Sequence, residues 1–321
     1  MTDNAQLVIG TDLGATTVKT GLVRPDGRIV YQNRFPTRAA DGPEAVVGQI
    51  LLSVREAIEH AGGASLGGLG LGSPGVVDDQ GVVKAPPNMT DWDEVPLRAM
   101  LREQLQRTVE VENDANAAAI AESRFGAGRA HPDFLFVIWG TGVGGGIILN
   151  RKIFRGPTGG AGEVGHVVID YEGLLCNCGS RGCVEAYVGQ RHLSRRTAER
   201  LEEFPSSRIL HYAKNDPTKI EPLHLSLAAE EGDPLAQEIL HEAGRLLGVA
   251  IGSVMNTMDL RVCIVGGGVS AVGESVFAAM EQSVRSHVLK PLRPGIRVIR
   301  AQFGNDAGIL GAAGLVLPSA K

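Results

Sequence analysis

Three of the four cysteines lie in one short segment, at Cys176, Cys178 and Cys183, and His166 stands ten residues before the first. Three thiolates and one imidazole form the ligand set of a closed tetrahedral zinc site, whereas a catalytic zinc ion keeps one position open for water. Crowded cysteines in a chain without secretory features favour a bound metal over a disulfide. We therefore predict a structural zinc ion held by these four residues, with free thiols or a disulfide as the alternatives.

Two turns rich in glycine and threonine could bind phosphate groups. Asp12–Thr16 follows an apolar segment that begins at Leu7, and Gly140–Gly142 follows the apolar segment Phe134–Trp139. Backbone N–H groups in such turns can surround an anion, and a carboxylate such as Asp12 can hold Mg²⁺ through water. The chain returns to a strand after Gly140–Gly142, so this turn does not fit the dinucleotide fingerprint, which opens a helix. An ordinary β-hairpin is the alternative for the first turn, but two such units indicate an internal duplication.

A third candidate is the segment Glu112–Asn116, which lies where a predicted strand ends and a predicted helix begins. Ligands often bind at this position in open α/β sheets. Asp114 could act there as a general base toward a substrate hydroxyl, or Asn113 or Asp114 could simply cap the helix. Three polar residues flank the predicted zinc site and would suit a polyol, although each could also be a surface or capping residue. They are Glu163, His166 and Glu185.

The composition limits the classes of protein to which the chain can belong. Its 321 residues, of which 43% are hydrophobic and 21% charged, exclude a disordered tail protein and suggest two domains. The net charge of −5, with no isolated basic cluster, argues against a nucleic-acid partner. No apolar stretch reaches the roughly 18 residues of a membrane span. The first ten residues lack the pattern of a signal peptide, so we expect a cytoplasmic protein.

Strands and helices are predicted to alternate along the chain in two halves. Apolar, β-branched segments predict strands over 7–13, 15–23, 28–32, 69–71, 107–112, 134–139, 146–150 and 260–265. Helical spacing of apolar residues predicts helices over 42–61, 115–125, 184–203, 234–258 and 308–317, with a polar, proline-containing stretch over 204–225. This alternation is typical of an α/β fold.

Together these segments resemble the ROK family of sugar kinases and repressors over nearly the whole chain. The motifs that carry the resemblance are Asp12–Thr16, Ser73–Gly75, Glu112–Asn116, Gly140–Gly142, Glu163–His166, Cys176–Glu185 and Gly266–Gly268. The pattern C-x-C-G-x-x-G-C-x-E over Cys176–Glu185 is the most specific of them. Within the family the resemblance is greatest to the bacterial glucokinases, through Glu163–His166 and Pro87–Asn88.

The resemblance implies an actin-like ATPase fold, that is, a duplicated ribonuclease H-like α/β fold with two domains around a cleft. The small domain would comprise residues 1–120 with the final helix over 309–321, and the large domain, with the zinc site, residues 121–308. The implied activity is ATP-dependent phosphorylation of glucose at its 6-hydroxyl, with Mg²⁺ accompanying ATP. The family tendency implies a homodimer or homotetramer.

The resemblance also implies roles for individual residues. Asp114 would be the catalytic base. The sugar would be bound by Gly75, Asn88, Asn113, Asp114, Glu163, His166 and Glu185. The nucleotide would be bound by Asp12, Gly14, Thr16, Lys19, Gly140, Thr141, Gly142, Gly267 and Gly268. His166 would in addition be a zinc ligand with Cys176, Cys178 and Cys183.

Several alternatives stay open on the sequence. The substrate could be N-acetylmannosamine, N-acetylglucosamine, fructose or mannose, because the choice among hexoses depends on a few contacts. Polyphosphate could replace ATP. A sugar-sensing regulator would need a DNA-binding domain before the first hairpin, and that hairpin begins by Leu7. A zinc-ribbon binding module would need a second cysteine cluster.

Overall fold

The computed structural model describes residues 6–87, 89–268 and 273–318, which form two compact units. Unit 1 comprises Met1–Pro132, Gly146–Gly162 and Asn305–Lys321, and unit 2 comprises Asp133–Gly145 and Glu163–Gly304. Residues 121–132 and 146–162 thus lie with the N-terminal part of the chain. The domain boundaries expected from the sequence, 1–120 with 309–321 and 121–308, stay a prediction, because a compact unit need not fold on its own.

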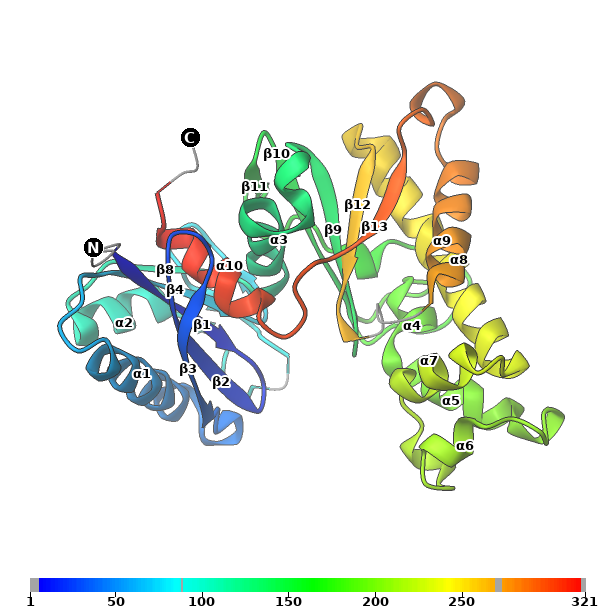
Figure 1. The fold of residues 1–321 in the computed structure, drawn as a ribbon, viewed down its shortest axis with the longest axis horizontal. Coiled ribbons are helices and arrows are strands. Elements are labelled where there is room, and N and C mark those ends of the chain that lie inside the picture. Colours follow the sequence, from blue (N-terminus) through cyan, green and yellow to red (C-terminus); the bar gives the residue numbers. More distant parts are fainter. Residues whose placement is uncertain (1–5, 88, 269–272, 319–321) are drawn as a thin grey trace. The chain divides into compact units, whose positions relative to one another are not determined.

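The sheet of unit 1 places the ends of three strands at one edge. Its strand order is β3-β2-β1-β4-β8. These strands are β1 (Leu7–Leu13), β2 (Thr17–Val23), β3 (Ile29–Pro36), β4 (Leu66–Ser73) and β8 (Val109–Asn113). The first three form antiparallel hairpins, whereas β1, β4 and β8 are parallel to one another. The carboxyl ends of β1, β4 and β8 therefore share one edge (Figure 1).

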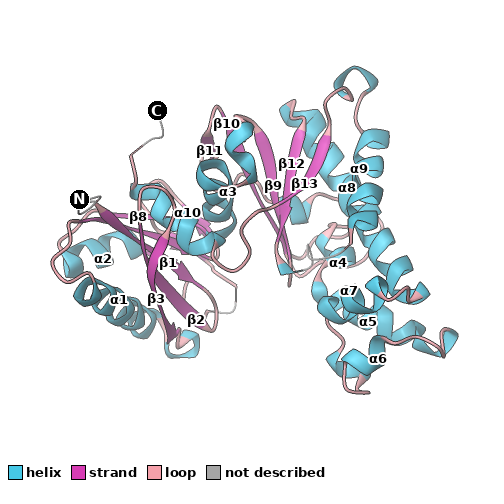
Figure 2. Ribbon diagram, viewed as in Figure 1, coloured by secondary structure: helices cyan, strands magenta, loops and turns pink. Residues whose placement is uncertain are grey.

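Helices cover both faces of this sheet (Figure 2). On one face, α1 (Pro43–His60) and α2 (Leu97–Leu105) bury an apolar core with side chains such as Ile9 and Leu71. On the other face, α10 (Ala307–Val316) packs on β1, β4 and α3 (Asp114–Phe125). A third, small sheet contains β5 (Val76–Val77), β6 (Val83–Lys84) and β7 (Glu94–Val95).

Glycines allow α10 to approach its neighbours at backbone distance. A Cβ atom on Gly10 or Gly70 would overlap the α10 carbonyl oxygens of Ile309 and Ala312, and one on Gly311 would overlap the carbonyl oxygen of Ala117 in α3. A side chain at Gly10 or Gly70 would force α10 away from the sheet, and one at Gly311 would force it away from α3. Part of the glycine content therefore serves the packing of this face.

The second sheet has the order β11-β10-β9-β12-β13. Its strands are β9 (Phe134–Trp139), β10 (Val143–Leu149), β11 (Lys152–Phe154), β12 (Val262–Gly266) and β13 (Arg297–Arg300). β12 is parallel to both β9 and β13, and the chain passes from unit 2 to unit 1 inside β10. The helices of unit 2 are α4 (Glu185–Val188), α5 (Gln190–Arg200), α6 (Ile209–Tyr212), α7 (Pro222–Glu230), α8 (Pro234–Met258) and α9 (Glu274–His287).

The longest helix and the strand before the second glycine turn have the predicted bounds, 234–258 and 134–139. Asp233 caps α8 by accepting the N–H of Ala236 at 2.9 Å, and Pro234 occupies its first position. The continuous helix predicted over 184–203 is wrong, because the backbone is extended at Gly189 (ψ 153°), which separates α4 from α5.

The strand predicted over 146–150 begins three residues earlier, at Val143, directly after the Gly140–Gly142 turn, so Gly144 and Gly145 belong to β10. The next strand after β2 likewise extends to Pro36 instead of ending at residue 32. The stretch 204–225 contains α6 and the start of α7. Within the described parts of the chain, every helix is too short or too polar to span a bilayer.

Candidate functional site

The turn between β1 and β2 holds the first group of predicted nucleotide-binding residues. Gly14 closes the turn by donating its N–H to the carbonyl oxygen of Thr17 at 3.0 Å, and Thr16 is exposed at its tip. Asp12, near the end of β1, accepts a hydrogen bond from Lys19 Nζ of β2 at 3.2 Å, and both side chains are about one-fifth exposed. The structure therefore brings the four predicted residues of this hairpin together.

The first turn of α10 lies against Asp12. A Cβ atom on Gly308, the second residue of α10, would stand 2.5 Å from Asp12 Cγ. A helix N-terminus carries a partial positive charge, which favours a carboxylate beside it. Gly308 was not singled out from the sequence: the resemblance implied that the final helix joins the small domain, but not which of its residues meets Asp12.

The junction of β8 and α3 presents the predicted base. Asn113 is the N-cap of α3, since its Oδ1 accepts the N–H groups of Ala115 at 3.0 Å and Asn116 at 3.1 Å. Its Nδ2 donates to the carbonyl oxygen of Gly75 at 3.0 Å. Asp114 is exposed, with Oδ1 accepting the N–H of Ala115 at 2.7 Å. The cap that the sequence offered as an alternative role thus belongs to Asn113.

The register of the strands places Asp12 of β1 and Glu112 of β8 at the same level of the sheet. Asp12 is the partner of Gly72 in β4, and Gly72 is the partner of Glu112 in β8. Because neighbouring strands lie about 4.8 Å apart, the backbones of Asp12 and Glu112 are separated by about 10 Å. Gly75 follows β4 with φ +87°, a left-handed conformation in which a Cβ would also contact Pro86. Asn88, predicted to bind sugar, lies outside the described residues.

The backbone of Val143 contacts two segments of unit 2 that were predicted to bind sugar, Glu185 and Glu163–His166. Its N–H donates to Glu185 Oε2 at 2.8 Å, and a Cβ on the preceding Gly142 would overlap the same carboxylate. Its carbonyl oxygen would be overlapped by a Cβ on Gly165, so the Glu163–His166 segment also packs on it. The sequence did not predict these contacts, because Val143 makes them through its backbone and its side chain has no polar group.

The two glycine turns of unit 2 follow neighbouring parallel strands. β9 pairs with β12, so Gly140 after β9 and Gly267 after β12 leave the same sheet edge. Gly267 has φ +95°, and a Cβ there would overlap the backbone of Trp139. A Cβ on Gly140 would stand 4.0 Å from the backbone nitrogen of Gly268. The turn at Gly140–Gly142 and the turn at Gly267–Gly268, both predicted to bind the nucleotide, therefore adjoin.

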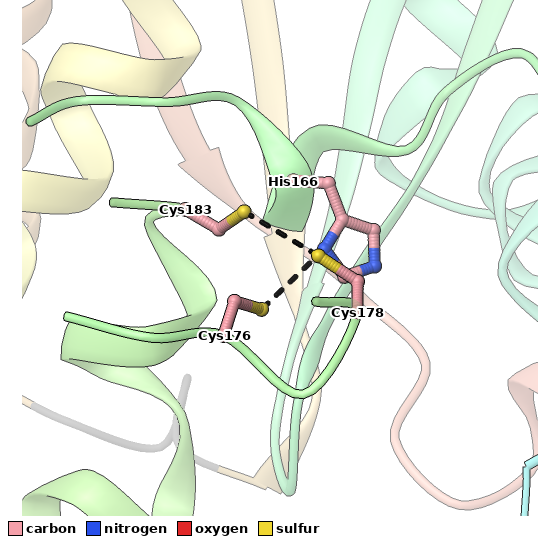
Figure 3. Close-up of side chains that lie close together, drawn as sticks. All are labelled: His166, Cys176, Cys178 and Cys183. Carbon is pink, nitrogen blue, oxygen red and sulfur yellow. Dashed lines mark hydrogen bonds between the residues drawn. The ribbon is translucent and has the colours of Figure 1, made fainter. Parts of the chain in front are cut away.

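The four predicted zinc ligands point toward one another (Figure 3). Their ligand atoms all lie within 4.8 Å of one another. Cys178 Sγ is 3.7 Å from Cys183 Sγ, and Cys176 Sγ is 3.8 Å from His166 Nδ1. A tetrahedral zinc ion with bonds of about 2.0–2.3 Å needs ligand atoms about 3.5–3.8 Å apart. The donor set and its spacing fit a zinc ion.

The three thiols of this cluster differ in acidity. The N–H of Ser180 lowers the pKa of the exposed Cys178 thiol to about 7, since a hydrogen bond to the sulfur favours the thiolate. Burial raises the pKa of Cys183 to about 12 and also raises that of Cys176. Buried thiols with raised pKa values become thiolates readily only when a cation stabilises them, which is what a bound metal does.

Two residues of unit 1 were not predicted as site residues although they adjoin the site. Glu112 appeared in the sequence only as the first member of its motif, and Arg155 carried no signal. Arg155 Nε donates to Glu112 Oε2 at 2.6 Å. A buried carboxylate requires a partner, but the sequence does not show which of 31 lysine and arginine residues supplies it.

Comparison with known proteins shows the family and the fold class of the chain. The family model described as "ROK family" matches residues 8–318. A glucokinase of Thermotoga maritima is 35% identical over 310 residues, covering 96% of both chains, and one of Streptomyces coelicolor is 38% identical over 313 residues, covering 96% and 97%. A ROK family glucokinase from Streptomyces griseus, solved with glucose and AMPPNP, matches with a TM-score of 0.84 and 38% identity over 97% of this chain and 99% of that one. These matches confirm the predicted α/β fold of the actin-like ATPase class. The chain belongs to the ROK family.

Proposed function

We propose that this protein transfers the γ-phosphoryl group of ATP to the 6-hydroxyl of glucose. The observation that carries the proposal is an exposed carboxylate, Asp114, at the same sheet edge as the Asp12 hairpin. The relatives named glucokinase support glucose as the acceptor, because they match this chain over nearly its whole length. The complex of the Streptomyces griseus enzyme supports both the sugar and the nucleotide.

Asp114 is proposed as the general base that accepts the proton of the attacking hydroxyl. Asp114 is exposed at the start of α3, and the N–H of Ala115 donates to its Oδ1 at 2.7 Å, which helps to hold the carboxylate in place. We propose that the sugar hydroxyls are held by Asn113 and the Gly75 turn, by Glu163, His166 and Glu185, and by Asn88. His166 could serve two partners, because Nδ1 faces the cysteines and leaves Nε2 for a hydroxyl.

The nucleotide is proposed to contact glycine turns in each unit. In unit 1 these groups are Asp12, Gly14, Thr16 and Lys19, and in unit 2 Gly140, Thr141, Gly142, Gly267 and Gly268. Phosphoryl transfer depends more on positioning and charge stabilisation than on covalent chemistry. Mg²⁺ bound with ATP supplies charge neutralisation at the phosphates. The carboxylate of Asp12 and the backbone N–H groups of the turns would orient the phosphate chain.

Zinc is proposed to have a structural role. His166, Cys176, Cys178 and Cys183 would supply four ligands, which leaves no position for a reacting water. The ion would fix His166 and the start of α4, where Glu185 lies. In this way the zinc ion would hold two of the proposed sugar-binding residues of unit 2, His166 and Glu185, in fixed positions relative to each other. A cytoplasmic homodimer or homotetramer is also proposed, on the family resemblance alone.

A coupled assay of ADP release tests the proposed reaction. The purified protein is given ATP and, separately, glucose, mannose, fructose, N-acetylglucosamine or N-acetylmannosamine. The proposal expects kcat/KM to be highest for glucose by at least about tenfold. A higher value for another hexose would reassign the substrate, and turnover only with polyphosphate would reassign the donor.

A further inference from the structure

The carboxylate of Glu112 is almost completely buried, with 1% of its side chain exposed, and the proposed reaction makes no use of it. It lies two residues before Asp114, at the end of β8. A buried carboxylate is costly unless donors surround it. Its surroundings therefore indicate what the protein gains from placing it there.

Three donors converge on Glu112. Oε1 accepts the backbone N–H of Asn113 at 2.9 Å and Nδ2 of Asn116 at 3.0 Å. Oε2 accepts Nε of Arg155 at 2.6 Å. Two of these donors belong to the junction that presents Asp114. The carboxylate thus holds both the residue before Asp114 and a residue in the first turn of α3.

Arg155 ties this junction to a second loop. It follows β11 directly and opens the segment 155–162, where its carbonyl oxygen accepts the N–H of Ala161 at 3.1 Å. A Cβ on Gly159 of this segment would overlap the carbonyl oxygen of Val77 in β5. The segment therefore packs beside the Gly75 turn, whose carbonyl oxygen holds Asn113.

We propose that Glu112 and Arg155 form a positioning pair for the catalytic carboxylate. The pair fixes the Asn113–Asp114 backbone against the segment 155–162, which leads in sequence to Glu163. Neither residue is proposed to touch the substrate. The inference rests on the proposed function, because it assigns Asp114 as the base.

Two single variants break the link from opposite sides. Glu112→Gln keeps the size of the side chain but can turn a donor toward the Arg155 donor. Arg155→Met removes the cation from a position that is 45% exposed, so it does not open the core. Arg155→Lys keeps the charge and should restore part of the function. Glu110→Gln is the matched control, because Glu110 lies two residues earlier on β8 and pairs with Arg98 and Arg102 at the surface.

The kinetic expectation is a loss in kcat without a matching loss in sugar binding. Residues that orient metal ligands typically contribute about 10–100-fold, and we expect the same range for a pair that orients a catalytic base. Glu112→Gln and Arg155→Met should each lower kcat in this range, with the dissociation constant of glucose changed by less than about threefold. The double variant should be no slower than the slower single variant, since both break one link. Arg155→Lys should lie closer to the parent, and Glu110→Gln should equal it.

Hydrogen exchange of the peptide containing residues 113–116 gives a readout independent of turnover. Exchange there should rise by about tenfold or more in Glu112→Gln and Arg155→Met and stay unchanged in Glu110→Gln. Unchanged exchange in both variants overturns the positioning pair, as do kcat values within twofold of the parent or losses that multiply in the double variant. If the parent phosphorylates no hexose, the proposed function fails, while the exchange measurement still decides the pair.

Discussion

The carboxylate of Glu185 accepts the backbone N–H of Val143 and lies against Gly142. A residue proposed to hold sugar is thus hydrogen-bonded to the turn proposed to hold phosphate. Glu185 also opens α4, two residues after Cys183, one of the four zinc-ligand candidates. Glu185 therefore links the segments of unit 2 that are proposed to bind sugar, phosphate and zinc.

Gly142→Ala tests this relation. The added Cβ would overlap the Glu185 carboxylate, so either the side chain or the turn has to move. We expect the KM values for both glucose and ATP to rise by about tenfold, which corresponds to about 1.4 kcal/mol of lost binding. Gly304→Ala is the control, because a Cβ there meets no atom within 4 Å. A rise in KM for only one of the two substrates would contradict the proposed link between the sugar-binding Glu185 and the phosphate-binding turn.

Zinc content measures the cysteine cluster directly. Purified parent protein should carry about one zinc ion per chain, and Cys178→Ser should lose most of it, because a hydroxyl is a poor replacement for a thiolate ligand. The melting temperature should fall with the metal. Cys263→Ala serves as the control, since Cys263 is buried in β12, outside the cluster. Equal zinc in the parent and Cys178→Ser would rule out the site.

Alkylation of the metal-free protein should report the acidity of Cys178. Its pKa is lowered to about 7, so the reactive thiolate is the minor form below that pH and the major form above it. We expect the rate of iodoacetamide labelling at Cys178, followed by mass spectrometry, to rise with pH and level off above about pH 8. Cys183, whose pKa burial raises to about 12, should react far more slowly. Zinc added beforehand should protect both.

The backbone contact between α10 and α3 is expected to dominate the effect of Gly311→Ala. The methyl group would overlap the carbonyl oxygen of Ala117, so the free energy of unfolding should fall by about 2–3 kcal/mol, as overpacking does. Gly48→Ala in α1 is the matched case, because a Cβ there meets no other part of the protein. Its helix propensity should raise stability by about 0.5–1 kcal/mol. Urea unfolding of both variants measures these free energies. Equal effects of the two substitutions would contradict the close packing of α10 on α3.

Local signals predicted much of the fold. The apolar stripe of α8, its Asp233 cap and Pro234 predicted the first and last residues of that helix correctly. The apolar run Phe134–Trp139 predicted the bounds of β9. The failures have physical causes. Gly189 ends α4 through an extended backbone, which an apolar pattern on either side does not reveal. The start of β10 at Val143 was missed, because the N–H of Val143 is bound by Glu185, a distant residue whose contact a glycine-rich segment does not reveal.

In the candidate site, too, the sequence predicted local groups of residues but not the contacts between distant segments. Residues whose chemistry is local, such as the four zinc-ligand candidates and the Asp12 hairpin, could be grouped from spacing alone. Contacts between distant segments could not. Glu112 and Arg155 are 43 positions apart, and Glu185 and Val143 are 42 apart. Only the folded chain shows which of many charged residues share a partner.

Product identification in the parent and in Asp114→Asn tests the central claim most directly. Both proteins are incubated with ATP and glucose, and the phosphate ester is assigned by phosphorus–proton NMR. The parent should form glucose 6-phosphate, and Asp114→Asn should bind glucose with similar affinity but form the product about 10²–10⁴ times more slowly. Asp79→Asn, an exposed carboxylate in the same unit, should match the parent. A phosphate ester at another position, or near-normal turnover in Asp114→Asn, would contradict the account.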